Sequence, residues 1–488
     1  MEDWREIYRQ RLTTPTEAVK AVKSGDTVVF PILAPPVMQF LLAARKDEVR
    51  DVTVRMLAPA IDPGWMRMPD ESVFKLEFEL FIGDFARFVM DERRGTFLPN
   101  LFSLNMKGYD QRDDVKIPEV VFVTVSKPNR AGYCHFGAHH WMQRSYARRC
   151  PTVIAVVDET LATPHGDVFI HVSEISHFVE LTTPPFGRAD FDRAMEQVPD
   201  EARKTAWLAL AERIPNLQII GGIAPMIPVV SPDAVAQVLG LSEPVPEAAE
   251  IARHVNSLIH DGDTVQIGVG EPGRGITNLG AFRGKAHLGI HTELGWPGIG
   301  RLWRDGIVDG SHKEIHAGKT TAAAWTGADP GDGEIIDDNP HFELYDPEYQ
   351  LSMRTLTRFE RFVSINNAIT VDLLGQINSE SVFGGRMING TGGQPELHLA
   401  GATSPKGRAI TLLPSTAMGG AVSRIVAQMD EGSYITVPRF FADTVITEYG
   451  IARLFGKTHR QRAEELIAVA HPDHRDDLRA QARALWWP

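Results

Sequence analysis

Residues 261–295 read DGDTVQIGVGEPGRGITNLGAFRGKAHLGIHTELG, and this stretch decides the fold prediction. Residues 264–267 predict a short buried strand, and residues 268–275 form a glycine-rich loop directly after it. A second apolar run, residues 288–290, ends in His291-Thr292-Glu293. Glycines let backbone N–H groups approach a ligand closely, and the carboxyl ends of neighbouring parallel strands face one crevice. We therefore predict that the loop and Glu293 share one ligand site.

Two other interpretations of this stretch stay open at the level of pattern. The glycines could serve only to turn a strand into a helix, leaving Glu293 as a solvated loop carboxylate. A dinucleotide-binding fold also places an acidic residue about 20 positions beyond its glycines, where it binds a ribose. Against that fold, Pro272 stands where the helix should open, and the turn is polar and carries Arg274.

Composition describes an ordinary soluble protein with more than one domain. At 488 residues the chain is too long for a single core, and its apolar share of 43% and charged share of 23% are typical of globular proteins. The net charge of −13, without a basic run, argues against nucleic acid as a partner. A phosphate-bearing coenzyme would need local basic residues against this acidic background.

The cysteine count, the first residues and the length of the hydrophobic runs indicate the cellular setting. Cys134 and Cys150 are the only cysteines, too few for a disulfide framework, which fits a reducing cytosol. The first residues, MEDWREIYRQRL, are charged and do not resemble a secretory signal. No run of about 20 apolar residues occurs, so we expect a cytoplasmic protein without a membrane span.

A short repeat predicts two similar domains in tandem. The fragment SGDTVVF at residues 24–30 recurs as DGDTVQI at residues 261–267, each time after a predicted helix. Near-continuous Val/Ile runs at residues 120–125 and 152–157 are typical of parallel strands buried on both faces. The predicted class is α/β, with domains at residues 1–224 and 248–488 and a Pro-rich linker at 225–247.

Further elements follow from periodicity and capping residues. Helices are predicted at residues 3–12, 17–22, 200–213, 234–239, 248–258 and 461–469. Strands are predicted at residues 52–54, 217–223, 362–368, 409–414 and 432–437. We expect the polar stretch 295–338 to run near the site without contributing to the core.

The segment 132–140 holds one cysteine and three histidines and invites a metal-site interpretation. Its spacing matches no usual ligand pattern, and all four residues fall within one short segment. We therefore interpret it as loop packing and predict no metal site.

Long motifs in the second half resemble the acetyl-CoA hydrolase/transferase family, which includes the 4-hydroxybutyrate and acetate CoA-transferases. These motifs are LGIHTEL, SINNAITVDLLGQINSES, NGTGGQPELHLAGA, LLPSTAMGGAVSRIV and VITEYGIARLFGKTHRQRAEELIAVAHPDHR. AGYCHFGAHHW and HGDVFIHVSEISHFVEL extend the resemblance to the first half. The resemblance implies two tandem open α/β domains of the CoA-transferase type, with the active site between them.

The resemblance also implies residue roles and a reaction. Glu293 would be the nucleophile, forming a mixed anhydride with the acyl group and then a glutamyl-CoA thioester, and the N–H of Gly393 or Gly392 would stabilise the oxyanions. Coenzyme A or acyl-CoA is then a substrate, and no permanently bound cofactor is expected. The residues implied to contact CoA are Gly268, Val269, Gly270, Glu271, Pro272, Asn389, Gly393 and Lys406, with Arg408 as the alternative to Lys406.

Three departures from the family pattern point to an unusual acid specificity. An Asn-Asn-Pro or Asn-Asp-Pro segment of relatives is replaced here by residues 350–353 (QLSM). Residues 294–298 (LGWPG) stand where relatives have MFSDG, and residues 31–36 (PILAPP) replace a glycine-rich turn. We expect all three segments to line the acyl pocket.

Rival functions remain open from the sequence. An acyl-CoA hydrolase could use the same scaffold, because water exclusion depends on the closed cleft. A nicotinamide-dependent oxidoreductase and a non-catalytic CoA-binding protein are further alternatives. A homodimer or larger homo-oligomer is expected from the resemblance alone, with small carboxylates and acyl-CoAs as the partners.

Overall fold

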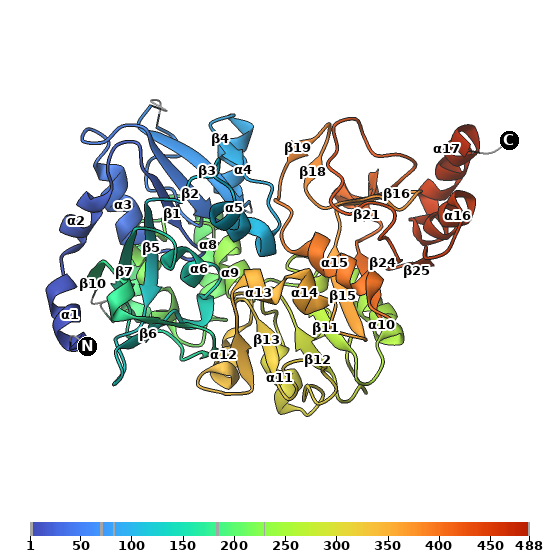
Figure 1. Ribbon diagram of the computed structural model, residues 1–488. Helices are drawn as coiled ribbons and strands as arrows, with labels where there is room; N and C mark the ends of the chain where they lie inside the picture. Colours follow the sequence, from blue (N-terminus) through green and yellow to red (C-terminus); the bar gives the residue numbers. More distant parts are fainter. Residues whose placement is uncertain (1–2, 69–71, 82, 182–184, 229, 487–488) are drawn as a thin grey trace.

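The computed structural model describes residues 3–68, 72–81, 83–181, 185–228 and 230–486. Two mainly parallel sheets form the two halves of the molecule, and the chain ends lie at opposite sides (Figure 1). The prediction of an α/β class is confirmed.

The first sheet has seven strands, and every recorded pairing in it is parallel. Its order is β10 (His177–Glu180), β7 (Thr152–Val157), β5 (Val120–Val125), β1 (Thr27–Phe30), β2 (Val52–Leu57), β3 (Phe74–Leu80) and β4 (Gly95–Phe97). Alternate side chains enter two different apolar clusters: Val121 and Val123 enter one, and Val120 and Phe122 the other. The Val-rich runs are therefore buried on both faces, as predicted.

Helices cover both faces of this sheet and continue into the segment that joins the halves. They are α1 (Trp4–Arg11), α2 (Pro15–Ala18), α3 (Pro36–Ala44), α4 (Asp84–Asp91), α5 (Asn105–Gln111), α6 (Gln143–Ala147), α7 (Arg188–Glu196), α8 (Glu201–Ala211) and α9 (Pro232–Val238). The side chain of Thr14 accepts a hydrogen bond from the N–H of Glu17, so Thr14 is the N-cap of α2.

The second sheet has nine strands, parallel except for the edge pair β25 and β24. Its order is β25 (Gly450–Arg453), β24 (Thr444–Thr447), β20 (Arg408–Leu412), β15 (Phe362–Asn367), β11 (Thr264–Ile267), β12 (Gly289–His291), β13 (Thr320–Ala322), β14 (Phe342–Leu344) and β8 (His165–Gly166). The edge strand β8 lies far earlier in the chain than the rest, so the first half contributes a strand to the sheet of the second.

The remaining helices surround the second sheet and form the far end of the molecule (Figure 1). They are α10 (Ala248–Leu258), α11 (Ile299–Arg304), α12 (Pro330–Ile336), α13 (Pro347–Gln350), α14 (Met353–Leu356), α15 (Gln394–Thr403), α16 (His459–Val469) and α17 (Arg475–Trp486). Small pairings complete the fold: β6 (Tyr133–His135) with β9 (Phe169–His171), β16 (Thr370–Asp372) with β17 (Ile377–Asn378) and β23 (Ile425–Val426), β18 (Ser381–Val382) with β19 (Arg386–Met387), and β21 (Thr416–Ala417) with β22 (Val422–Ser423).

Two strand predictions are wrong. The 217–223 segment lies in a 3₁₀ helix (Leu217–Met226), because its apolar side chains pack on the helical cluster around Phe191 and Trp207 instead of a neighbouring strand. Residues 433–436 have no regular secondary structure, and Val437 pairs with Ile377 in an isolated antiparallel bridge.

The polar stretch 295–338 forms core, contrary to the prediction. It supplies α11, α12 and β13, and all three residues of β13 are buried in the sheet. Its Thr-Thr-Ala sequence has hydroxyls where most buried strands have aliphatic side chains, so the apolar pattern failed to reveal it.

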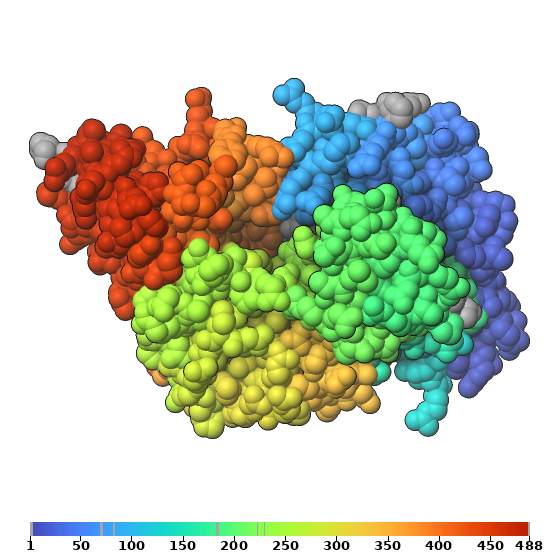
Figure 2. All heavy atoms as spheres, turned by 180° about the vertical axis from the view of Figure 1, so that it is seen from behind, coloured from blue at the N-terminus to red at the C-terminus, as the bar shows by residue number. Residues whose placement is uncertain are grey.

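The predicted domain ranges stay predictions, although the halves are visibly interleaved. Seen from behind, the green segment that carries α7 to α9 covers the side of the first half and reaches the yellow-green start of the second (Figure 2). Among the described residues, the helices are too short or too polar to cross a bilayer.

Candidate active site

Glu293 lies immediately beyond the carboxyl end of β12. Its backbone carbonyl accepts hydrogen bonds from the N–H groups of Ala323 and Ala324, at 2.9 and 3.3 Å, so the segment that follows β13 fixes its backbone. Leu294 and Trp296, which follow it, are buried in the apolar clusters of the two halves. The nucleophile candidate therefore stands on a rigid support.

The carboxylate of Glu293 meets the N-terminus of α15. The N–H of Gly393 donates to Oε2 of Glu293 at 2.8 Å. A Cβ on residue 393 would stand 2.1 Å from that oxygen, so only glycine permits this approach. The free N–H groups of a helix N-terminus attract negative charge, and they therefore favour the ionised form of Glu293.

Burial opposes that ionisation. It raises the pKa of Glu293 to about 8, the Gly393 hydrogen bond lowers that pKa, and the charge of Glu396 raises it. Glu396 is itself 2% exposed, and burial raises its pKa to about 7. Strongly shifted carboxyls in a buried site are typical of catalytic groups.

A buried polar network supports β12 and Thr292, which follows it. The amide nitrogen of Gln350 donates to the carbonyl of Thr292 at 3.0 Å and to Oγ1 of Thr321 at 3.2 Å. His291 bonds the carbonyl of Gln350 through Nε2 at 2.6 Å and Thr321 through Nδ1 at 2.9 Å. Sequence reasoning found Gln350 only as a departure and missed this supporting contact.

Asn367 holds the glycine loop in place. Its Nδ2 lies 3.1–3.2 Å from the carbonyl oxygens of Gly268, Val269 and Gly270, and its Oδ1 accepts from the N–H of Gly273 at 2.8 Å. The loop therefore has a fixed backbone, and Val269 is 42% exposed on it. Asn367 ends β15, next to β11, so the rule that ligand sites lie at carboxyl ends of parallel strands could have found it.

In the same loop, Arg274 is buried and Glu271 is half-buried. Burial raises the pKa of the Glu271 carboxyl, and the charge of Arg274 partly offsets that rise. Arg274 also donates to Oγ of Ser242 at 3.2 Å, which ties the loop to the segment that joins the halves. Pro272 follows Glu271 through a cis peptide bond.

The loop that carries Asn389 and Gly393 joins the two halves of the molecule. The N–H of Gly390 donates to the carbonyl of Phe81, which follows β3, at 2.6 Å. Nη2 of Arg87 lies 3.4 Å from Oδ1 of Asn389. The Glu293 site thus lies where the carboxyl end of β3 meets this loop.

Lys406 and Arg408 lie at the amino end of β20, whereas the glycine loop and Glu293 lie at the carboxyl ends of their strands. Lys406 precedes β20, whereas Gly268 and Glu293 follow β11 and β12, and all three strands run in the same direction. The length of a five-residue strand such as β20, about 17 Å, therefore separates Lys406 from the end of the sheet that carries Glu293. Arg408 forms a close ion pair with Asp263. The structure does not bring Lys406 or Arg408 to the glycine loop. A contact of either residue with CoA stays a prediction, and this placement does not support it.

Two of the three departures lie beside Glu293 and Gly393, and the third lies in the first half. Cδ1 of Leu351 would be 3.3 Å from a Cβ on residue 393, so the 350–353 segment lies against Gly393. Leu294 belongs to the same buried apolar cluster as Leu351. Residues of the 31–36 segment line a cavity at the ends of β1 and β2.

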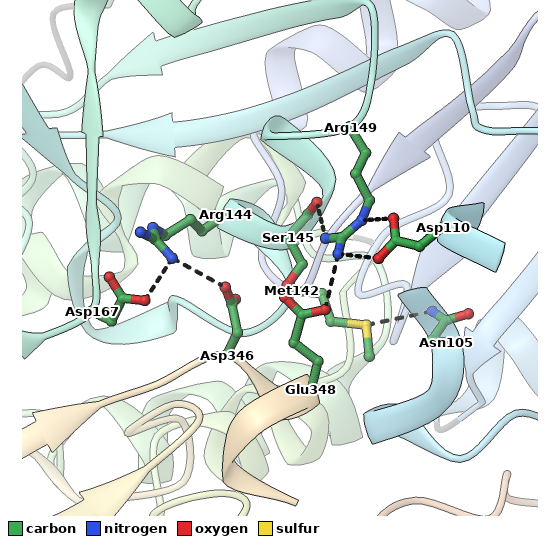
Figure 3. Close-up of polar contacts among 9 residues, drawn as sticks. All are labelled: Asn105, Asp110, Met142, Arg144, Ser145, Arg149, Asp167, Asp346 and Glu348. Carbon is green, nitrogen blue, oxygen red and sulfur yellow. Dashed lines mark hydrogen bonds and ion pairs between the residues drawn. The ribbon is translucent and has the colours of Figure 1, made fainter. Parts of the chain in front are cut away.

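Ion pairs join the two halves at α13 and at Asp346, which precedes it (Figure 3). Arg149, just after α6, binds both carboxylate oxygens of Asp110 at 2.7 Å and reaches Oε2 of Glu348, on α13, at 3.2 Å. Burial raises the pKa of Asp346, next to α13, to about 7.

The 132–140 segment is largely buried, although Tyr133 is exposed. Cys134 is buried, and burial raises the pKa of its thiol to about 12. Burial lowers the pKa of His139 to about 4 and that of His140 to about 3. Within the described ranges, no three His, Cys, Asp or Glu side chains gather as metal ligands would.

Known proteins resemble the chain over nearly its whole length. The acetyl-CoA hydrolase/transferase C-terminal domain matches residues 333–482. A succinyl-CoA:cyclohexane-1-carboxylate CoA transferase of Geobacter metallireducens is 30% identical, covering 98% of this chain and 96% of that protein. The chain belongs to the acetyl-CoA hydrolase/transferase family.

Other members of this family resemble the chain equally broadly. A 4-hydroxybutyrate coenzyme A transferase of Clostridium kluyveri is 29% identical, covering 98% of both chains. The crystal structure of a 4-hydroxybutyrate CoA-transferase of Porphyromonas gingivalis superimposes with a TM-score of 0.69 at 27% identity, covering 99% of this chain and all of that one. The predicted CoA-transferase fold and the prediction of an enzyme of the CoA-transferase class are confirmed.

Proposed function

We propose that the protein transfers CoA between an acyl-CoA and a small carboxylic acid through a glutamyl-CoA thioester on Glu293. The observation that carries the proposal is the buried Glu293 carboxylate, bound to the N–H of Gly393 at the N-terminus of α15. A carboxylate is a weak nucleophile in water, and removal of solvent together with a fixed position makes it reactive toward a thioester.

The steps balance without an outside reagent. An oxygen of Glu293 attacks the thioester carbon, the C–S bond breaks, and an acyl-glutamyl anhydride and CoA thiolate form. The thiolate attacks the glutamyl carbonyl, releasing the first acid as a carboxylate and leaving a glutamyl-CoA thioester. A second carboxylate reverses these two steps and leaves as the new acyl-CoA.

Two neighbours of Glu293 suit this chemistry. The Gly393 N–H can donate to the oxyanion that develops at each tetrahedral stage, a contribution typically worth about 3–4 kcal/mol. The glycine loop held by Asn367 presents an exposed backbone at the carboxyl end of β11, where a CoA thioester can lie beside Glu293. Binding of CoA by Gly268 to Pro272 and by Asn389 is part of the proposal.

Peptide mass spectrometry tests the proposal. The protein is incubated with a panel of acyl-CoAs without acceptor acid, and the peptide that contains Glu293 is examined for a CoA adduct. We expect the adduct in the wild type and its loss in Glu293→Ala, with transfer falling by at least about 10³-fold while CoA still binds. Retained turnover in Glu293→Ala would remove Glu293 from the mechanism.

The hydrolase alternative gives a different result in the same experiment. Acetyl-CoA hydrolases of Eremothecium gossypii and Kluyveromyces lactis match 24% of the chain at 32% identity. Steady release of free CoA without an acceptor acid and without an adduct would assign that activity here. The homo-oligomeric state and the cytoplasmic location stay predictions.

A further inference from the structure

Glu396 is a buried carboxyl group to which the proposed steps assign no part. It stands at the third position of α15, three residues after Gly393, and is only 2% exposed. Both of its side-chain oxygens are buried, and neither has a hydrogen-bond partner within the part of the chain that the structure describes. Burying a carboxyl group without a partner costs free energy, and such groups in folded proteins often have a catalytic role.

The start of α15 offers one N–H group to two carboxyl groups. A glutamate at the third position of a helix commonly reaches back to the N–H of the N-cap residue. In α15 the N-cap is Gly393, and its N–H donates to Oε2 of Glu293 at 2.8 Å instead. Glu293 therefore holds the donor, and the carboxyl group of Glu396 is left unpaired in the same helical turn.

Glu396 lies on the side of α15 that faces the first half. Glu396 and Ala400 are four residues apart, so they share one face of the helix. Ala400 packs in the buried apolar cluster that contains Leu294 and, from the first half, Phe102. The N–H groups of Phe102 and Ser103 and the hydroxyl of Ser103 lower the pKa of Glu396, so these residues lie near its carboxyl group. That group is thus enclosed between the two halves.

No cation balances the carboxyl groups at this site. Among the described residues, no lysine, arginine or histidine forms an ion pair with Glu293 or Glu396, and none lowers the pKa of either. Arg354, on the helix α14 that packs against α15, is exposed, and Arg408, beneath the other end of α15, is held in an ion pair. Burial lowers the pKa of His398, on α15 itself, to about 4 and keeps it neutral. An incoming carboxylate therefore meets no positive charge here.

The acceptor acid arrives when Glu293 carries no charge. In the glutamyl-CoA thioester the Glu293 carboxylate is consumed, and the acid must bring its own carboxylate to the glutamyl carbonyl, beside Glu396. Small carboxylic acids are ionised near neutral pH. Protonated Glu396 can donate a hydrogen bond to such a carboxylate, whereas ionised Glu396 repels it. Burial raises the pKa of Glu396 to about 7, so both forms occur near neutral pH.

We infer that Glu396 controls the entry of the acceptor acid: its neutral form donates a hydrogen bond to the acid's carboxylate, and its anion excludes the acid. This inference rests on the proposed function, because it concerns the second half of that reaction. No bond forms to Glu396, and its proton stays on its own oxygen while the acid's carboxylate attacks the glutamyl carbonyl and CoA thiolate leaves toward the new acyl group.

Discharge of the preformed thioester by acetate tests the inference. The wild-type protein is loaded with CoA from an acyl-CoA, freed of small molecules and mixed with acetate at pH values between about 6 and 9, while mass spectrometry follows the adduct on the Glu293 peptide. We expect the second-order rate constant to be level below pH 7 and to fall at least about 10-fold by pH 9, as Glu396 ionises. A level rate constant throughout would overturn the inference.

Hydroxylamine separates repulsion of the acid from other effects of pH. Uncharged hydroxylamine attacks the same glutamyl carbonyl, releases CoA and leaves a hydroxamate on Glu293. Because it brings no carboxylate, its rate constant should not fall between about pH 7 and pH 9. An equal fall with hydroxylamine and acetate would show that the acid's charge is not what Glu396 acts on, and the inference would be wrong.

A variant pair assigns the fall to Glu396. Glu396→Gln keeps the size of the side chain and a hydrogen-bond donor, and it cannot ionise. We expect its acetate rate constant to stay level up to pH 9 and to exceed that of the wild type there by at least about 10-fold. Glu464→Gln removes an exposed carboxylate from α16 and should keep the wild-type fall. A wild-type fall in Glu396→Gln would exclude Glu396 as its cause.

The outcomes also separate this inference from the proposed function. Absence of any CoA adduct on the Glu293 peptide of the wild type would count against the proposed function and the inference together. An adduct that acetate discharges equally fast at pH 6 and pH 9 would overturn only the role of Glu396. The kcat/KM for acyl-CoA reports the first half of the reaction and depends on the ionisation of Glu293, so it should not share the fall.

Discussion

At the scale of single residues, Glu293 combines two opposed requirements. Removal from water makes its carboxylate reactive, and the same removal raises its pKa to about 8. One hydrogen bond, from Gly393, favours the ionised form, and the charge of Glu396 disfavours it. The reactive fraction of the protein near neutral pH therefore depends on these three residues.

The pH dependence of transfer follows from this balance. Only the ionised Glu293 can attack, so kcat/KM should rise about 10-fold per unit below pH 8 and level off above it. Glu396→Gln removes the neighbouring charge and should shift the midpoint to lower pH. Initial rates between about pH 6 and pH 10 measure both midpoints. A flat profile, or the same midpoint in the variant, would contradict this account.

Gly393 is predicted to tolerate no side chain. Gly393→Ala places a Cβ where Oε2 of Glu293 now lies, 2.1 Å away, so the carboxylate must move off its donor. We expect kcat to fall about 10²–10³-fold. The matched control is Gly333→Ala in α12, where a Cβ meets nothing within 4 Å; that change should leave kcat unaltered and raise stability by about 1 kcal/mol.

At the scale of elements, the site consists of three segments that each follow a strand. The glycine loop follows β11, Glu293 follows β12, and Asn367 ends β15; these three strands are neighbours in one parallel sheet. Parallel order brings residues about 100 positions apart in sequence to one edge, as the Asn367–Gly268 contact shows. Asn367 holds this loop by hydrogen bonds to its backbone.

We predict that Asn367→Asp weakens CoA binding. Its Nδ2 donates toward three loop carbonyls, and a carboxylate there would repel those oxygens, so KM for acyl-CoA should rise at least about 10-fold. Asn256 holds the 280–283 loop through carbonyls in the same way. Asn256→Asp should lower the melting temperature and leave that KM unchanged. Equal KM values in both variants would show that the hydrogen bonds from Asn367 to the loop do not determine CoA binding.

At the scale of the whole molecule, the halves are tied together at several points. β8 of the first half pairs with β14 of the second, and the N–H of Trp141 donates to Ala323, next to the support of Glu293. Arg149 adds an ion pair to Glu348 across the junction (Figure 3). The site is consequently assembled only when both halves have folded.

This interleaving predicts a single unfolding transition. Calorimetry and circular dichroism should give coincident midpoints, with equal calorimetric and van't Hoff enthalpies. Removal of Arg149 by Arg149→Ala should lower the melting temperature by a few degrees without splitting the transition, since a partly exposed pair contributes about 1 kcal/mol or less. Two separated transitions would show that the halves fold independently.

The sequence by itself determined the parts of this protein that local pattern encodes. The Val-rich strands β5 and β7 and the helix α10 fall where periodicity placed them, because burial on both faces or on one stripe leaves a direct trace in composition. The glycine loop and Glu293 were found because glycine and a carboxylate at strand ends carry recognisable chemistry. The family resemblance supplied the prediction of a role for Gly393.

Only the tertiary structure decided the rest, because those features depend on contacts between distant residues. The sequence pattern did not reveal β13, because its threonines give no apolar signal. Gln350, Asn367 and Glu396 are ordinary polar residues in the sequence, and only folding places them around Glu293 and the glycine loop. Lys406 looked suitable by its charge, and strand direction put it at the other edge of the sheet. Sequence fixes which groups exist; the packing of the two sheets fixes which of them meet.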